Sequence, residues 1–327
     1  MQNVGSGDFV YQPIPDWQKL PDDIPLVEAV GVAVNSRNEV FVFNRGEPPV
    51  MVFARDGNFL RGWGEGRFVR PHGIWIDTDD TLYLTDDKGH SVRQFSGDGE
   101  LLRVIGPAGV PSASGVQDFD YRTISCGAMP FHYPTNLAIS GGGDIYVSDG
   151  YGNARVHRFS PDGEWMQSWG QPGDRHGQFN VPHGIAIDSS DRVYVADREN
   201  SRIQIFTAAG DFIGQWTDLI RPCEVFIGTE QLAYVAELGN RNGLYPWMRR
   251  EPGAVGGRVS IFDLDGRLLS RWGGGNDATR GGEFYAAHDI WVDSGGDIYV
   301  GEVAVTAAGL VGESAAGLPT LRKFSRR

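Results

Sequence analysis

Cysteine and basic residues are scarce in this sequence of 327 residues. Its two cysteines, Cys126 and Cys223, are too few for a disulfide framework, although the sequence is compatible with one bond between them. Lysine and arginine number 29 against 42 aspartates and glutamates, which makes the formal net charge −13. An acidic chain is a poor ligand for nucleic acid or an anionic membrane, so neither is expected as a partner.

Long apolar runs are also lacking. No segment reaches the length of a transmembrane helix, and residues 1–17 have neither the basic nor the apolar region of a signal peptide. The sequence therefore predicts a cytoplasmic protein. Helical periodicity is scarce as well, which favours an all-β fold. Nothing in the sequence indicates an oligomeric state.

One pattern occurs six times. Each copy has an apolar strand, a turn of Asp, Ser, Gly or Asn, and a second strand, which is the chemistry of a hairpin. The copies are GVAVNSRNEVFVFNRG (31–46), HGIWIDTDDTLYLTDD (72–87), TNLAISGGGDIYVSDG (135–150), HGIAIDSSDRVYVADR (183–198), CEVFIGTEQLAYVAEL (223–238) and HDIWVDSGGDIYVGEV (288–303). Most copies continue with a third strand such as SRIQIF and a fourth such as EWMQSWG. Four strands in about forty or more residues predict a six-bladed β-propeller.

The N-terminal segment is expected to close the propeller. The sixth copy has its third strand late, at 321–324, and the sequence then ends without a fourth strand. The segment FVYQPIPDW (9–17) precedes the first blade and is predicted to supply that strand, because pairing would hide two sheet edges. Residues 1–327 are thus expected to form one propeller domain.

Three of the seven histidines share one repeat position. His72, His183 and His288 begin the innermost strands of the second, fourth and sixth blades. Alternate blades of a six-fold ring lie about 120° apart, so the three imidazoles are expected to converge on the axis. Three protein ligands with an open fourth position are typical of catalytic zinc, although iron and manganese accept the same ligands. Isolated structural histidines are the alternative, which the regular spacing disfavours.

Other side chains are expected on the face where the histidines enter. The turns between second and third strands share this face, and they carry Arg45, Tyr151 and Arg198. For each of these side chains taken singly, a hydrogen bond or ion pair between blades is the favoured interpretation. The long insertions are expected there too, as rims or lids over a pocket, at 107–132, 238–257 and 304–319.

Carboxylates form a second group near the predicted axis. Asp289 directly follows His288 and, together with backbone carbonyls, suits a hard cation such as calcium. The matching positions of the fifth blade hold Cys223 and Glu224. Cys223 is expected to be a packed apolar residue, and the sequence indicates no role for Glu224.

The repeats resemble the peptidyl-α-hydroxyglycine α-amidating lyase family, whose repeats are of the NHL type. The resemblance runs from about Gly31 to the last strand and is carried by PHGIWIDTDDTLYLTD, SDGYGNARV and VADRENSRIQ. It implies a catalytic zinc held by His72, His183 and His288. It implies a general base at Tyr151 and active-site arginines at Arg45 and Arg198. It also implies a structural calcium held by the carbonyls of Val32 and Ile74 and by Asp289.

The same resemblance implies cleavage of the N–C bond of a peptidyl- or N-acyl-α-hydroxyglycine to an amide and glyoxylate. In this reading Tyr151 takes the hydroxyl proton and Arg198 holds a substrate carboxylate. The expected partner is a small-molecule or peptide-like substrate. Two alternatives stay open, namely a zinc-dependent hydrolase or hydratase for another small carbonyl compound and a non-catalytic NHL propeller that is a binding platform.

Overall fold

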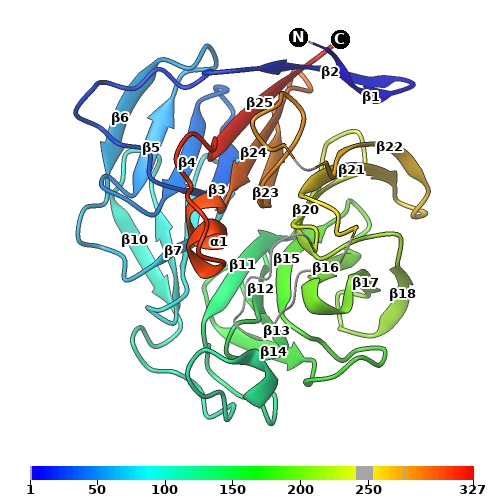
Figure 1. The fold of residues 1–327 in the computed structure, drawn as a ribbon. Helices are drawn as coiled ribbons and strands as arrows, with labels where there is room; N and C mark the ends of the chain where they lie inside the picture. The colour runs from blue at the N-terminus through cyan, green and yellow to red at the C-terminus, as the bar shows by residue number, and fades with distance from the viewer. Residues whose placement is uncertain (1, 241–252, 276) are drawn as a thin grey trace. The chain divides into compact units, whose positions relative to one another are not determined.

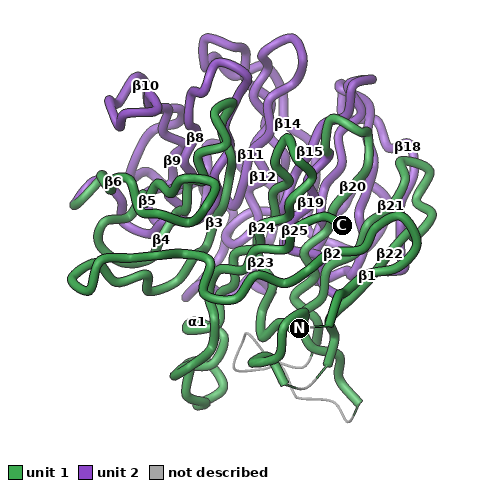
Figure 2. Tube along the Cα trace, turned by 90° about the horizontal axis from the view of Figure 1, so that it is seen from above, with its two compact units in different colours: residues 1–65, 228–327 green, residues 66–227 purple. Residues whose placement is uncertain are grey.

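The computed structural model describes residues 2–240, 253–275 and 277–327. The described residues form 25 strands in six sheets, with one short α-helix and two short 3-10 turns. The protein is therefore an all-β, six-bladed propeller, as the repeats predict (Figure 1). The chain divides into two compact units (Figure 2), which are unit 1 (Met1–Glu65 and Gly228–Arg327) and unit 2 (Gly66–Ile227). That residues 1–327 form a single domain stays a prediction.

Unit 2 contains three complete blades and the first strand of a fourth. Blade 2 consists of β7 (Pro71–Ile76), β8 (Leu82–Asp86), β9 (Ser91–Phe95) and β10 (Leu101–Ile105). Blade 3 consists of β11 (Pro134–Ile139), β12 (Ile145–Asp149), β13 (Arg155–Phe159) and β14 (Trp165–Trp169). Blade 4 consists of β15 (Pro182–Ile187), β16 (Val193–Asp197), β17 (Arg202–Phe206) and β18 (Phe212–Trp216). The unit also holds β19 (Pro222–Ile227) and the turns η1 (Tyr121–Thr123) and η2 (Arg198–Asn200).

Unit 1 contains blades 1 and 6 and the remaining strands of blade 5. Blade 1 consists of β3 (Ala29–Val34), β4 (Val40–Asn44), β5 (Val50–Phe53) and β6 (Phe59–Trp63). Blade 5 continues from β19 with β20 (Leu232–Glu237), β21 (Arg258–Asp263) and β22 (Leu268–Gly273). Blade 6 consists of β23 (Ala287–Val292), β24 (Ile298–Glu302), β25 (Leu321–Arg326), β2 (Phe9–Ile14) and β1 (Val4–Ser6). Helix α1 (Ala304–Leu310) follows β24.

The closing strand is confirmed. Strand β2 pairs antiparallel with β25, with Pro13 opposite Phe324, and so supplies the fourth strand of blade 6. The strand ends at Ile14, short of the predicted end at residue 17. Strand β1 adds a fifth strand outside it. The outward edge of β2 is therefore paired, and the outer edge of blade 6 is the three-residue strand β1, which is too short to be a long exposed edge.

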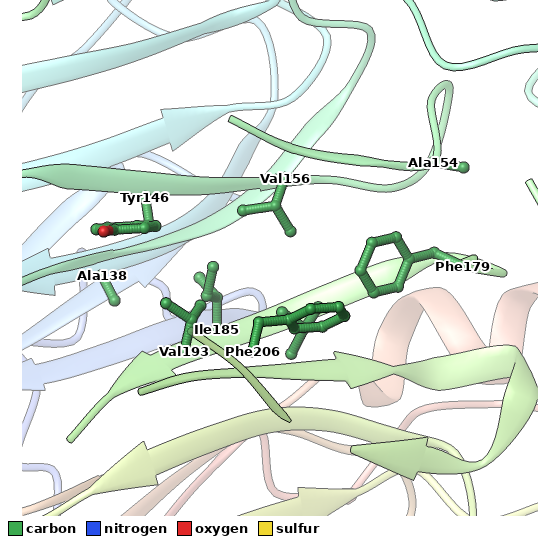
Figure 3. Close-up of a cluster of buried hydrophobic side chains, with 9 residues drawn as sticks. Ala138, Tyr146, Ala154, Val156, Phe179, Ile185, Val193 and Phe206 are labelled. Atoms are coloured by element: carbon green, nitrogen blue, oxygen red, sulfur yellow. The ribbon is translucent and has the colours of Figure 1, made fainter. Parts of the chain in front are cut away.

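The apolar residues of the repeats form the core between neighbouring blades. In unit 2 one buried cluster joins blades 3 and 4 (Figure 3), and its members are Ala138, Tyr146, Ala154, Val156, Phe179, Ile185, Val193, Val195 and Phe206. The second strands β12 and β16 are buried along their whole length, because both of their faces pack against other blades. The fourth strands β14 and β18 are only partly buried. The core therefore lies nearer the inner strands, which hold the candidate site residues.

A carboxylate at the end of each second strand in unit 2 fixes the entry to the innermost strand of its blade. Asp86 accepts hydrogen bonds from the amides of Val69 and Arg70, at 2.9 Å each. Asp149 and Asp197 make the matching contacts in blades 3 and 4. Charged acceptors make strong hydrogen bonds when buried. Asp86 therefore holds the backbone just before His72, which restricts where that imidazole can lie.

Neither cysteine forms a disulfide bond. Cys126 is exposed, Cys223 is buried, and both are free thiols. The buried position of Cys223 agrees with the expected apolar packing, and burial raises the pKa of its thiol to about 11. Among the described residues, no helix has the length and apolar character needed to cross a membrane. The cytoplasmic location stays a prediction.

Candidate active site

The three repeat histidines are oriented in the same way. Each Nδ1 lies at hydrogen-bond distance from a backbone carbonyl at the same repeat position of the next blade. The acceptors are Thr135 for His72 (2.6 Å), Cys223 for His183 (2.8 Å) and Val30 for His288 (2.8 Å). A carbonyl only accepts, so Nδ1 carries the proton and Nε2 offers its lone pair. Such outer contacts commonly fix the ring and the tautomer of metal-binding histidines.

All three repeat histidines are buried, and two of them lie together in unit 2. The rings of His72 and His183 are 4.9 Å apart, centroid to centroid. Imidazoles at this spacing can share a metal ion. That His288 of unit 1 completes the ligand set stays a prediction.

Tyr151 joins two of these histidines within unit 2. It follows β12 by two residues, and its hydroxyl lies 3.0 Å from Nε2 of His72 and 2.9 Å from Nε2 of His183. Arg198 donates from Nη1 to the same oxygen, at 3.3 Å. The phenolic oxygen is therefore surrounded by two imidazoles and a guanidinium. The sequence placed Tyr151 and Arg198 on the face of the histidines, and the structure brings both together with His72 and His183.

Arg198 is held by a buried ion network that is not predicted from the sequence. Its Nε donates to Oε1 of Glu199 at 2.7 Å, and Nη2 of Arg221 donates to the same oxygen at 2.8 Å. Burial raises the pKa of Glu199, but the charges of Arg198 and Arg221 outweigh burial and hold it below its ordinary value. The carboxylate is thus ionised at neutral pH. The only sequence signal for this network is that Glu199 directly follows Arg198.

The insertion 107–132 covers the ring of Tyr151. The Phe119 ring lies 5.3 Å from the Tyr151 ring, centroid to centroid. The insertion is anchored near this point, because Ser114 donates its hydroxyl proton to the carbonyl of Gly152. The guanidinium of Arg70 lies 4.9 Å from the Phe119 ring and 5.6 Å from the Tyr151 ring. Neither Phe119 nor Arg70 is predicted from the sequence as a site residue, although Arg70 stands two residues before His72.

Arg45 makes a different set of contacts, in unit 1. It follows β4, and its Nη1 donates to Oε2 of Glu28 at 2.9 Å and to the hydroxyl of Thr306 at 3.1 Å. The backbone amide of Thr306 donates to the other oxygen of Glu28 at 2.6 Å. Arg45 therefore ties α1, which lies in the insertion 304–319, to the start of blade 1. Its role as an active-site arginine stays a prediction. Of the insertion 238–257, residues 241–252 lie outside the described residues.

Asp289 is a buried carboxylate in unit 1. Its Oδ2 accepts from the amide of Val32 at 3.1 Å, and its Oδ1 accepts from the amide of Ile290 at 2.7 Å. Burial raises the pKa of Asp289, while these two amides lower it. A cation at this point would stabilise the charged form. The calcium site of Val32, Ile74 and Asp289 stays a prediction.

Glu224 has a structural partner that explains its position. Its Oε2 accepts a hydrogen bond from the side-chain amide of Asn136, and its Oε1 accepts from the amide of Val225 at 3.1 Å. Asn136 lies in blade 3 and Glu224 in β19, so the pair reaches past blade 4. Gly184 stands between them, and a Cβ there would lie 2.7 Å from Oε1 of Glu224. Glycine at this repeat position therefore leaves the space that the buried pair needs.

The repeats match a known family of sequences. Residues 131–159 and 179–206 match the NHL repeat. This protein is a six-bladed propeller with NHL repeats in two of its blades. The two matched segments cover parts of blades 3 and 4, which contain Tyr151 and His183.

Several curated proteins are similar to this NHL-repeat chain. Peptidyl-α-hydroxyglycine α-amidating lyase 1 of Drosophila melanogaster is 30% identical over 268 residues, which cover 76% of this chain and 45% of that protein. Peptidylglycine α-amidating monooxygenase of Rattus norvegicus is 32% identical over 240 residues, 62% of this chain and 22% of that protein. NHL repeat-containing protein 3 of Homo sapiens is 34% identical over 200 residues, 57% of this chain and 54% of that protein. The chain thus spans about half the length of these relatives or less.

Solved structures share the fold of the NHL-repeat chain. A streptogramin B lyase structure has a TM-score of 0.58 at 12% identity and covers 98% of this chain and 87% of that chain. Virginiamycin B lyase of Staphylococcus aureus has a TM-score of 0.55 at 13% identity, with 92% and 82% covered. Identities this low relate the folds alone.

Proposed function

We propose that this protein is a zinc-dependent lyase that cleaves the N–C bond of a peptidyl- or N-acyl-α-hydroxyglycine, which yields an amide and glyoxylate. The contacts of the Tyr151 hydroxyl with His72, His183 and Arg198 carry the proposal. The relatives named as amidating lyases support the same reaction class.

The residues at the site suit zinc. The hydroxyl of Tyr151 lies within hydrogen-bond distance of Nε2 on both His72 and His183. A single phenolic proton can satisfy one of these two lone pairs, whereas a cation satisfies both. Neutral imidazoles are typical ligands of catalytic zinc. A zinc ion held by His72, His183 and His288 would supply Lewis-acid chemistry, which polarises a substrate oxygen and lowers the pKa of a hydroxyl.

Tyr151 is the proposed base. Its oxygen takes the proton from the substrate hydroxyl, and the electron pair of that O–H bond forms the aldehyde C=O of glyoxylate. The N–C bond breaks at the same carbon, and its electrons leave with the amide nitrogen. The nitrogen takes up a proton from Tyr151, so the reaction needs no water or further reactant. Arg198 lies 3.3 Å from the phenolic oxygen and stabilises negative charge on it.

The remaining predicted groups belong to the same proposal. Arg45 is proposed as the second active-site arginine, placed by Glu28 beside α1. Calcium is proposed at Asp289 with the carbonyls of Val32 and Ile74, as a structural ion that offsets a buried carboxylate. The ion pair of Arg45 and the burial of Asp289 are equally expected in a lyase and in a zinc-dependent hydrolase or hydratase. Analysis of the reaction products decides between these enzymes.

The test is glyoxylate release from α-hydroxyhippurate. Protein whose zinc content has been measured should release glyoxylate and benzamide well above the level seen with metal-stripped protein. Tyr151→Phe should lower turnover by about 10²- to 10⁴-fold while zinc stays bound. Tyr133→Phe is the matched control, because the Tyr133 ring also packs against Phe119, at 4.8 Å between centroids. Near-normal turnover of Tyr151→Phe contradicts the base role. A protein that binds zinc but releases no glyoxylate favours the hydrolase or hydratase. A protein that neither binds zinc nor releases glyoxylate favours the binding platform.

A further inference from the structure

Arg70 is an accessible cation beside the proposed base. Its guanidinium lies 5.6 Å from the centroid of the Tyr151 ring, close to the corresponding distance of 5.3 Å for Arg198. The two arginines differ in exposure, because the Arg70 side chain is 25% exposed and that of Arg198 is 1% exposed. A molecule that arrives from solvent therefore meets Arg70 before Arg198.

The two guanidiniums also differ in what they already bind. Arg198 donates to Glu199 through Nε and to Tyr151 through Nη1. The Nη2 of Arg70 pairs with Asp87 at 2.8 Å, and its Nε is buried without a hydrogen-bond partner among the described residues. A guanidinium has five N–H donors. With Nε buried and Nη2 beside Asp87, the two donors of Nη1 are left for a ligand.

The surroundings of Arg70 hold its guanidinium in place. The backbone amide of Arg70 donates to Asp86 at 2.9 Å, and the fully buried Asp87 holds Nη2. Phe119 covers one side of the guanidinium at 4.9 Å. An apolar ring at this distance keeps water away and strengthens an ion pair with an incoming anion. The result is a fixed, partly covered cation with free donors.

We propose that Arg70 binds the substrate carboxylate and thereby selects α-hydroxyglycines with a free acid over their esters and amides. The inference rests on the proposed function, whose substrate carries a carboxylate on the carbon that Tyr151 acts upon. A carboxylate matches the planar fork of a guanidinium. In this proposal Arg70 takes the carboxylate that the sequence assigns to Arg198, and Arg198 acts on the Tyr151 hydroxyl, which it contacts through Nη1. Arg70 is thus a specificity residue rather than part of the proton transfer.

A purely structural role makes a different prediction. If Arg70 only anchors Phe119 through its cation–π contact, a neutral side chain will disturb the binding of acid and amide ligands alike. If Arg70 reads the carboxylate, only acids will lose affinity. Arg67 is the matched control, because its guanidinium also lies over a phenylalanine, Phe95 at 6.0 Å, without contacting Tyr151.

The experiment measures binding by calorimetry to the zinc-loaded protein. The probes are hippurate, which lacks the hydroxyl and cannot react, and hippuramide, which lacks the charge as well. Arg70→Gln should weaken hippurate binding by about tenfold to a hundredfold, the size expected for a charge-assisted pair, and leave hippuramide unchanged. Arg70→Lys should restore part of the loss, and Arg67→Gln should bind both probes like the wild type. Circular dichroism checks that each variant is folded.

Kinetics then separate this inference from the proposed function. Arg70→Gln should raise the KM for α-hydroxyhippurate and leave the KM for its methyl ester unchanged. Unchanged hippurate affinity in Arg70→Gln, equal loss for both probes, or no hippurate binding to the wild type would each overturn the role of Arg70. Arg70-dependent hippurate binding without glyoxylate release from any protein would leave the carboxylate site standing and refute the lyase.

Discussion

Glu199 is predicted to be a main source of stability at the candidate site. Its Oε1 accepts from Arg198 at 2.7 Å and from Arg221 at 2.8 Å, and the side chains are only 4%, 1% and 7% exposed, in the order Glu199, Arg198 and Arg221. Glu199→Gln keeps the shape of the side chain but removes its negative charge. The buried guanidiniums of Arg198 and Arg221 then lie together with no carboxylate between them. Breaking a buried ion pair on one side typically costs about 3–5 kcal/mol. We expect a loss of this size in the free energy of unfolding.

Urea unfolding followed by circular dichroism measures this loss of free energy at pH 7. A thermal melt is a second measurement of the same loss. For a unit of the size of unit 2, 1 kcal/mol lowers Tm by about 2–4 °C, so the variant should melt about 6–20 °C lower. Glu164→Gln is the control, because Glu164 is exposed and its side chain has no partner among the described residues. A Glu199→Gln protein within about 0.5 kcal/mol of the wild type would refute the reasoning, since ordinary surface changes are of that size.

The pH dependence gives a second check on Glu199. Its pKa in the folded protein lies below the ordinary value, so the stabilisation is complete above the unfolded value of about 4.3. It is lost as the pH falls through the folded value, because the carboxylate then takes up a proton in the folded state as well. The difference between wild type and Glu199→Gln should therefore be constant near neutral pH and shrink in acid. A difference that grows in acid would contradict the assigned direction.

Three further predictions test other parts of the site. Gly184→Ala would place a Cβ 2.5 Å from the carbonyl oxygen of Cys223, so it should lower the free energy of unfolding in urea by about 1–3 kcal/mol. Gly142→Ala is the control and should leave it unchanged, because its Cβ would lie 3.8 Å from the nearest atom. Glu28→Gln removes the ion pair that ties α1 to Arg45, and hydrogen exchange in 304–310 should become faster; unchanged protection would mean that α1 is held by its buried alanines alone. His183→Ala should lose the zinc that the wild type retains after dialysis, whereas the exposed His176→Ala should keep it, and full zinc in both would remove His183 from the ligand set.

Much of the site was predictable because the repeats carry positional information. Residues at equal repeat positions lie at equal depth in a propeller, so His72, His183 and His288 could be grouped before any coordinates were known. The same reasoning placed Tyr151 and Arg198 on one face, after the second strands of their blades. The contacts of Glu199, Arg221 and Arg70 could not be obtained in this way. Arg70 and Arg221 hold the same repeat position, two residues before His72 and Cys223, yet Arg70 pairs with Asp87 and Arg221 with Glu199.

The all-β fold, the number of blades, the closing strand and the shared repeat position of the three histidines follow from the sequence, because a periodic pattern of apolar strands and turns encodes each of them. Which charges meet depends on the folded structure. It paired Arg198 with Glu199 and Tyr151, paired Arg45 with Glu28, and set Phe119 of an irregular insertion over the Tyr151 ring. Side-chain partners across blades depend on distances that no repeat period encodes. Within unit 2, these distances leave Arg70 as a partly exposed guanidinium beside Tyr151.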